Sequence, residues 1–318
     1  MNRRESLQTL GLAAGVLLIQ GMKGCTGKER SSGKQQTEFK FCLNTSTIRG
    51  QKQGLLKDIE TAARAGYDSI ELWVRDIEQY LNSGNTLNEL NRYIKDTGIE
   101  VASAIGFAPW MSDIEEVSKQ GFDQMKNEME MMAALDCQRI AAPPAGTFRE
   151  DKLDLFAAGQ RYRELLALGR ETGVMPQLEF WGASEKLFHM GQLLMMAAVA
   201  SDKDTRLLPD VYHMFRGGSG YETLDMISGH MIEIFHMNDF PANIPRTEQK
   251  DADRVFPGDG AAPMQTIMQS LSDMGGRIHL SLELFNPGYW EKDALEVAKT
   301  GLEKMREMGE VKVEDEKS

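Results

Sequence analysis

The stretch that decides the fold is Met231-Ile-Glu-Ile-Phe-His236-Met-Asn-Asp239-Phe240. Its apolar residues predict a buried strand, because short apolar runs rich in β-branched and aromatic residues are typical of sheet interiors. Packing of a strand requires neither the imidazole of His236 nor the carboxylate of Asp239. We therefore interpret the end of this strand as a candidate metal or proton-transfer site, which other strands should complete by ending in the same way.

Strand-like and helical runs alternate along the rest of the chain. The expected strands are residues 39–43, 69–72, 100–105, 139–142, 175–180, 206–211, 231–240 and 277–284. The expected helices are residues 55–65, 87–97, 114–135, 152–172, 184–200, 221–228, 263–274 and 290–308. This alternation predicts a single-domain α/β fold, a (β/α)8 TIM barrel over residues 38–310, followed by a charged tail at 311–318. The alternative, a doubly wound open sheet, is disfavoured because no Gly-x-Gly-x-x-Gly turn follows the first strand.

The composition is that of an ordinary globular protein. Of the 318 residues, 41% are hydrophobic and 26% are charged, and the formal net charge is -12. This acidic balance argues against a nucleic-acid partner, because binding to phosphates requires clustered Lys and Arg. Cys42 and Cys137 are expected to be buried free thiols, since no Cys/His spacing indicates a zinc cluster.

The first 37 residues differ from the rest, and we interpret them as an export signal and a polar linker. The pair Arg3-Arg4 precedes an apolar core at residues 10–19, which resembles a twin-arginine signal and predicts export to the periplasm. Cys25 resembles the lipid-attachment cysteine of bacterial lipoproteins. A lipid anchor at this residue is the only membrane attachment that we expect. The alternative is a disordered cytoplasmic N-terminus.

Four late strands end in residues that can bind a metal ion. They contribute Glu179, Asp210, His236 and Glu283. In a barrel these ends meet at one face, where three carboxylates would repel each other unless a cation neutralises them. An oxygen-rich set with one nitrogen suits a divalent ion such as Mn2+, Mg2+, Co2+ or Zn2+. A single carboxylate at a strand end is more often a helix cap, so the inference depends on the coincidence of all four.

The order of these motifs carries a family resemblance. It comprises Glu179, Asp210-x-x-His213, His236-x-x-Asp239, Arg254 before the Gly-rich turn at 257–260, and Glu283. This set resembles the xylose-isomerase-like superfamily of sugar phosphate isomerases and epimerases, over residues 39–308. The resemblance implies that Glu179, Asp210, His236 and Glu283 bind one divalent metal ion, and that Glu179 and Glu283 are the catalytic acid/base pair.

The resemblance also implies roles for residues around the metal. His213 and Arg254 would bind substrate oxygens, and Asp239 would orient His236 or another metal ligand through a hydrogen bond. A salt bridge within the loop is the alternative for Arg254.

Residues at other strand ends are weaker candidates for substrate binding. Glu71, Trp110 and Trp181 lie at such ends, and aromatic faces suit the C–H surfaces of sugars. Core packing is the alternative for the aromatic residues.

Together these observations predict a metal-dependent isomerase or epimerase of a keto sugar or keto-inositol, acting through an enediolate. The substrate is expected to be an unphosphorylated carbohydrate or polyol, since no phosphate-binding turn is present. One alternative is a lyase or dehydratase acting on an inosose or 3-keto-sugar, because the same enediolate can expel a β-substituent. Another is a non-catalytic sugar-binding lipoprotein. A homo-oligomer is compatible with the sequence.

Overall fold

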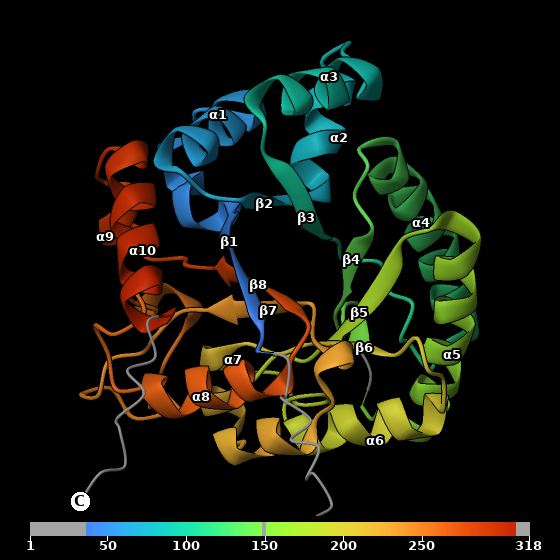
Figure 1. Cartoon of the computed structure of the whole chain (residues 1–318). Helices are drawn as coiled ribbons and strands as arrows, with labels where there is room; N and C mark the ends of the chain where they lie inside the picture. The colour runs from blue at the N-terminus through green and yellow to red at the C-terminus, as the bar shows by residue number, and fades with distance from the viewer. Residues whose placement is uncertain (1–35, 148–150, 310–318) are drawn as a thin grey trace, which may run out of the picture. The chain divides into compact units, whose positions relative to one another are not determined.

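Eight parallel strands form the centre of the computed structural model, which describes residues 36–147 and 151–309. Figure 1 shows these strands surrounded by helices. The strands are β1 (Glu38–Asn44), β2 (Ser69–Trp73), β3 (Glu100–Ile105), β4 (Arg139–Ala142), β5 (Met175–Glu179), β6 (Arg206–Leu208), β7 (Ile234–Met237) and β8 (Arg277–Leu282).

The strands close into a barrel. Hydrogen bonds join them in the orders β3-β2-β1-β8-β7 and β4-β5-β6. Parallel bridges from Leu207 to Ile232 and from Asp210 to His236 connect the β6 and β7 segments. Between β3 and β4, Arg139 Nη1 donates to the Ala102 carbonyl oxygen at 3.3 Å. The predicted TIM barrel is confirmed, and the carboxyl ends of its strands meet at one face.

Helices cover the outside of the barrel, and the longer ones pack against it through an apolar face. In α1 the buried residues Leu55, Ile59 and Ala62 recur at helical spacing. No helix in the described ranges is long and apolar enough to cross a membrane. The helices are α1 (Leu55–Ala65), α2 (Val74–Asn82), α3 (Leu87–Thr97), α4 (Glu115–Ala134), α5 (Leu155–Thr172), α6 (Met190–Ala200), α7 (Val211–Gly217), α8 (Met264–Met274), α9 (Pro287–Trp290) and α10 (Ala294–Gly309).

Apolar side chains form two separate clusters. The larger one fills the space between strands and helices. The smaller one lies among residues of the strands themselves and consists of Cys42, Trp73, Ala102, Ile105, Ala141, Leu208 and Ile234. Cys42 and Cys137 are both buried and unpaired, as predicted. This small cluster thus brings together side chains from six of the eight strands, with Leu208 and Ile234 among them.

Several element boundaries differ from the sequence prediction. Strand β6 stops at Leu208 rather than at residue 211, because Pro209 has no N–H for the sheet and Asp210 caps helix α7. Helices α2 and α7 were not predicted, and α6 begins at Met190 rather than at residue 184. The helix predicted at 221–228 is a 3-10 helix, η3 (Tyr221–Met226).

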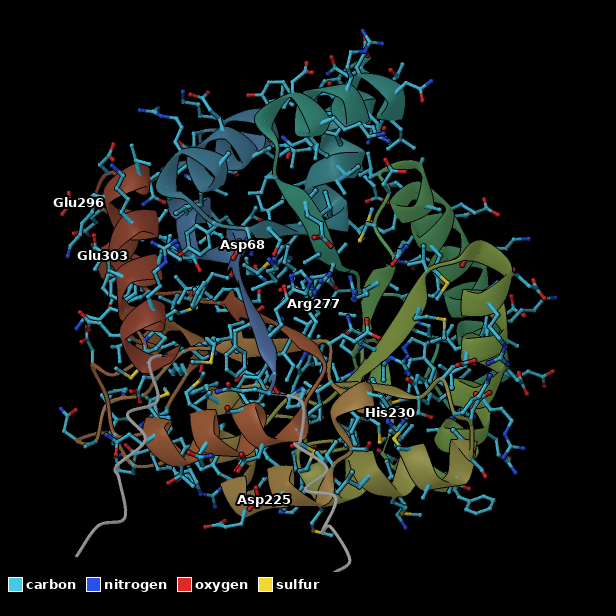
Figure 2. All side chains as sticks on the ribbon, in the orientation of Figure 1. Asp68, Asp225, His230, Arg277, Glu296 and Glu303 are labelled. Carbon is cyan, nitrogen blue, oxygen red and sulfur yellow. The ribbon has the colours of Figure 1, made fainter. Side chains whose placement is uncertain are left out.

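Figure 2 shows the side chains of the described residues on this frame. Charged groups such as Glu296 and Glu303 of α10 project outward. The predicted twin-arginine pair Arg3-Arg4, the candidate lipid anchor Cys25 and the tail at 311–318 lie outside the described residues.

Candidate active site

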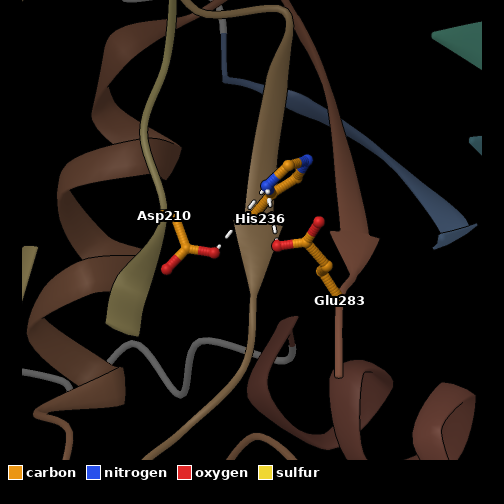
Figure 3. A group of neighbouring side chains, drawn as sticks. All are labelled: Asp210, His236 and Glu283. Carbon is orange, nitrogen blue, oxygen red and sulfur yellow. Dashed lines mark ion pairs between the residues drawn. The ribbon is translucent and has the colours of Figure 1, made fainter. Parts of the chain in front are cut away.

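Three predicted metal ligands converge at the carboxyl end of the barrel. Asp210 precedes α7, His236 lies in β7 and Glu283 follows β8; all three are buried, and one ligand atom from each lies within 4.8 Å of the others. The Nδ1 atom of His236 is 3.7 Å from Asp210 Oδ2 and 3.3 Å from Glu283 Oε2. Figure 3 shows both carboxylates directed toward this nitrogen.

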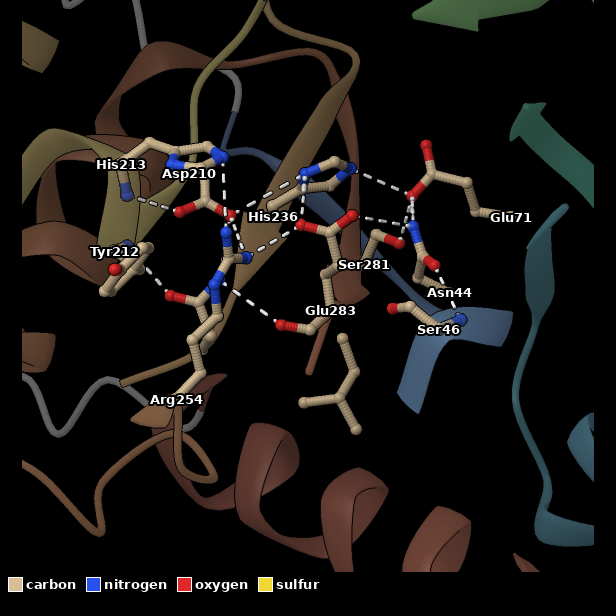
Figure 4. A network of polar contacts seen from close by, with 12 residues as sticks. Asn44, Ser46, Glu71, Asp210, Tyr212, His213, His236, Arg254, Ser281 and Glu283 are labelled. Atoms are coloured by element: carbon tan, nitrogen blue, oxygen red, sulfur yellow. Dashed lines mark hydrogen bonds and ion pairs between the residues drawn. The ribbon is translucent and has the colours of Figure 1, made fainter. Parts of the chain in front are cut away.

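Glu71 fixes the orientation of the His236 ring from the opposite edge. Its Oε2 atom lies 2.9 Å from His236 Nε2 and accepts hydrogen bonds from Asn44 Nδ2 at 2.9 Å and Ser281 Oγ at 2.7 Å (Figure 4). Because a carboxylate only accepts, the proton of this contact belongs to Nε2. In the neutral imidazole the lone pair of Nδ1 then lies between Asp210 and Glu283, and Nδ1 has no hydrogen-bond partner among the described residues.

This donor set fits a divalent metal ion. One imidazole nitrogen and carboxylate oxygens from Asp210 and Glu283 are ligands that Zn2+, Mn2+ and Co2+ accept. A carboxylate behind the imidazole is the usual support of a metal-binding histidine. Burial opposes protonation of His236, but Glu283 and Glu71 raise its pKa well above the usual range. The neighbouring carboxylates therefore favour a positive charge at this position, either a proton on His236 or a metal ion.

Glu179, the fourth predicted ligand, stands beside the other three rather than within their group. It ends strand β5, is buried, and its Oε2 atom has no hydrogen-bond partner in residues 36–147 and 151–309. Burial, together with the negative charges of Glu283 and Asp210, raises its pKa well above the usual range despite the opposing charge of His236.

The pKa of Glu283 moves in the opposite direction. Burial opposes its ionisation, but the positive charges of His236 and Arg254 lower its pKa below the usual range. The pKa values of the two glutamates are thus shifted in opposite directions. A pair of carboxyl groups whose pKa values are pushed apart is suited to acid/base work.

Arg254 reaches the cluster from the loop after β7, as predicted. Its Nη1 atom donates to Asp210 Oδ2 at 3.1 Å and Glu283 Oε2 at 2.8 Å, and its Nη2 atom donates to Asp251 Oδ1 at 2.6 Å. Burial opposes its charge, but Asp210, Asp251 and Glu283 raise its pKa. The loop salt bridge with Asp251 and the contact with the site are both present.

His213 lies against Arg254, with 3.2 Å between Nε2 and the Nη2 atom of Arg254. Its Nδ1 atom accepts a hydrogen bond from the Gly182 backbone at 3.2 Å. Burial is the main reason that its pKa falls below the usual value, so the ring is neutral. Both residues predicted to bind substrate oxygens are therefore brought to the ligand cluster.

Asp239 has a different role from the one predicted. Its carboxylate does not contact His236 but accepts backbone N–H bonds from Phe240, Gly258, Gly260 and Ala262 at 2.8–3.1 Å. A Cβ atom on Gly260 would collide with Asp239 Oδ1 and the Phe240 carbonyl oxygen. Asp239 therefore anchors the ends of the loop that carries Arg254.

Asp239→Asn should lower the free energy of unfolding by about 2 kcal/mol or more. The new amide nitrogen would face backbone N–H groups that now donate hydrogen bonds to the carboxylate, and those groups would lose their acceptor. Urea unfolding measures this change. Asp259→Asn is the control, since Asp259 pairs with Lys304 on the surface and should contribute less than about 1 kcal/mol. Equal effects of the two substitutions would contradict the anchoring role.

Glu71 holds the position that was predicted for Asp239. Glu71 was expected to bind substrate, yet it is fully buried and bonded to His236, the support expected from Asp239. Strands β2 and β7 are not neighbours in the sheet, so this contact crosses the barrel interior.

Glu71→Gln should weaken metal binding by about 10- to 100-fold, because losing the carboxylate behind His236 removes what orients the imidazole. Zinc titration with a competing chelator measures the affinity. Glu128→Gln, at a buried carboxyl of α4 outside the site, is the matched control. Unchanged zinc affinity in Glu71→Gln would show that Glu71 does not support a metal ligand.

Trp110 is not part of the site. It is fully buried, its ring packs 6.0 Å from that of Tyr162, and α4 lies against its backbone at Gly121. The core-packing alternative therefore describes this residue. Trp181 is half-buried instead, with its ring 6.0 Å from that of Phe107, which is 41% exposed.

Sequence reasoning missed several polar supports of the site. Asn238 donates to Asp210 Oδ2 at 2.8 Å, and Asn44 donates to Glu283 Oε1 at 3.3 Å. The guanidinium of Arg254 lies 4.5 Å from the centre of the Tyr212 ring. A signal existed for Asn238, because alternate residues of a strand share a face and Asn238 is two positions after His236.

Known proteins resemble this chain in sequence and in fold. A family model described as a xylose isomerase-like TIM barrel matches residues 59–308. An inosose isomerase of Halalkalibacterium halodurans is 29% identical over 269 residues, which cover 82% of this chain and 93% of the relative. The inosose isomerase of Bacillus subtilis is 26% identical over 283 residues, covering 82% and 95%.

Solved structures have the same fold. The IolI protein with a bound zinc atom superposes with a TM-score of 0.78 at 24% identity, covering 85% of this chain and 98% of that protein. D-psicose 3-epimerase in the presence of D-fructose superposes with a TM-score of 0.67 at 17% identity, covering 85% and 99%. Because the family model spans most of the sequence, the chain belongs to the xylose isomerase-like TIM barrel family.

Proposed function

We propose that this chain is a divalent-metal-dependent isomerase or epimerase that acts on a keto sugar or keto-inositol by proton transfer. The observation that carries the proposal is the unpaired Nδ1 atom of His236, which Glu71 directs toward the carboxylates of Asp210 and Glu283. Relatives named inosose isomerases support a keto-inositol as substrate, and the zinc atom bound in the IolI structure supports dependence on a metal ion.

The proposed metal ligands are Asp210, His236 and Glu283, with Glu179 completing the set. A divalent ion held there would polarise the carbonyl and neighbouring hydroxyl of the substrate and acidify the C–H between them. These residues alone leave a surplus of negative charge in a buried site, which is costly without a cation.

The residues of the chain then perform the proton transfer. Glu179 and Glu283 form the acid/base pair: one takes a proton from the substrate carbon, and the other returns one to the resulting enediolate. Arg254 donates hydrogen bonds to the oxygen on which negative charge develops, and His213 binds a hydroxyl beside it. Burial of all four side chains keeps water from competing for the proton.

Solvent exchange tests this function. The zinc- or manganese-loaded protein in D2O should introduce deuterium at the carbon next to the ketone of an inosose or ketose, measured by NMR or mass spectrometry. Absence of exchange with every keto sugar and inosose tried would contradict the proposal and favour a binding protein. Loss of water or of a glycosyl group from the product would indicate a lyase instead.

A further inference from the structure

Arg49 lies beside the acidic site, and the proposed reaction does not use it. It belongs to the 3-10 helix η1 (Thr45–Gln51), which follows β1 at the carboxyl end of the barrel. Its guanidinium carbon is 3.6 Å from the centre of the Trp73 ring, and Trp73 donates its indole N–H to Asn44 Oδ1 at 2.8 Å. Asn44 in turn donates to Glu283. Successive contacts therefore connect Arg49 with a member of the proposed acid/base pair.

The Nε and Nη2 atoms of Arg49 are buried and have no hydrogen-bond partner among the residues that the structure describes. They form one edge of the guanidinium and carry parallel N–H bonds, which match the two oxygens of a carboxylate. Burial, and then the positive charge of Arg75, lower the pKa of Arg49 to about 10, so the group stays charged at neutral pH. Leaving two charged donors unpaired is costly, and a carboxylate ligand removes that cost.

Packing alone explains only part of this arrangement. Stacking on Trp73 is a cation–π contact, which uses the face of the guanidinium and leaves its edge unpaired. Arg75 lies over the same ring at 4.7 Å, but it has a counter-ion in Asp76 at 3.5 Å. No ion pair joins Arg49 to an acidic group within the described ranges. Of the two arginines over Trp73, Arg75 has an anionic partner and Arg49 does not.

Aromatic side chains surround this position. The Trp73 ring lies 5.3 Å from Phe107 and 6.0 Å from Phe285, and the Phe285 ring lies 5.2 Å from the guanidinium carbon of Arg254. These rings connect the surroundings of Arg49 with those of Arg254. Apolar walls strengthen an ion pair formed between them, because they exclude water.

We propose that Arg49 binds a carboxylate of the substrate, so that, of the two substrate classes proposed above, the reacting molecule is a keto sugar with an acid group rather than a keto-inositol. This inference rests on the proposed function, which places the carbonyl end of the same molecule at Asp210, His236 and Glu283. The carboxylate at the other end lies against the Nε and Nη2 edge of Arg49. Within a strongly acidic protein, this unpaired cation selects an anionic substrate over a neutral one.

The test compares D-fructuronate with D-fructose, which differ only by a carboxylate in place of the terminal hydroxymethyl group. Calorimetric titration of the zinc-loaded full chain should give about 10- to 100-fold tighter binding of D-fructuronate, the effect expected of hydrogen bonds to a charged group. Arg49→Gln should abolish this preference, whereas Arg75→Gln, the matched control, should retain it. Equal binding of both sugars by the wild type, or an undiminished preference in Arg49→Gln, would overturn the inference.

Two further measurements keep the outcomes distinct. Arg49→Lys keeps the charge without the paired N–H edge and should retain only part of the preference; thermal unfolding verifies that each variant is folded. Deuterium exchange of the same sugars then reports on catalysis. Selective binding of D-fructuronate without exchange would contradict the proposed reaction but support the role of Arg49. Deuterium exchange without tighter binding of D-fructuronate would support the proposed reaction but contradict the role of Arg49.

Discussion

Glu179→Gln should reduce deuterium exchange into a keto substrate by about 10²- to 10⁴-fold, the usual contribution of a positioned acid or base. Gln has the shape of Glu179 but cannot hold a transferable proton. The structure makes this substitution informative, because Asp210, His236 and Glu283 form a ligand group without Glu179. We expect the variant to retain its metal ion while losing activity, measured by exchange kinetics and metal content on one preparation.

Glu128→Gln is the control for this substitution. Glu128 is also a buried carboxyl with an unpaired oxygen, but it lies in α4 against Gly106, outside the site. Its substitution should change exchange by less than about twofold, since it does not touch the reacting groups. Activity of Glu179→Gln close to that of the wild type would assign proton transfer to another residue.

The second large effect concerns the metal. Zinc added at about 100 times its dissociation constant should raise the free energy of unfolding of the wild type by about 2.7 kcal/mol, because it binds only the folded state. His236→Gln should lose this stabilisation and also the exchange activity, since it removes the sole nitrogen ligand. Denaturant unfolding with and without zinc measures the difference.

His279→Gln is the matched control, because His279 is equally buried, lies in β8 and bonds Ser69 through Nδ1 at 2.9 Å. It lies near the start of β8 and contacts the first residue of β2, whereas Glu283 follows the end of β8. This variant should lose some stability but keep the full response to zinc. A zinc response that persists in His236→Gln would place the metal elsewhere.

A single rule of topology accounts for the residues that the sequence placed at one face. Parallel strands of a barrel end at the same face, and the structure groups Asp210, His236 and Glu283 there, with Glu179 beside them. Arg254 and His213 came from the family resemblance, and the structure places both against the cluster.

Contacts across the barrel could not be predicted in this way. Glu71 contacts His236 across the barrel interior, although their strands, β2 and β7, are not neighbours in the sheet. The spacing of residues along the chain does not predict such a contact. The prediction that Asp239 supports His236 could have been avoided. Successive side chains of a strand point to opposite faces, so Asp239 points away from the face that His236 and Asn238 share. Arg49 gave no sequence signal, since its meaning depends on unpaired donors that only coordinates reveal.

The central claim is that Asp210, His236 and Glu283 hold one catalytic metal ion. Mass-spectrometric metal analysis of the full chain, dialysed against limiting zinc or manganese, tests it most directly. The account predicts one ion per wild-type chain, almost none in His236→Gln, and one in His279→Gln. A wild-type protein that binds no divalent ion, or a His236→Gln variant that retains a full equivalent, would contradict it.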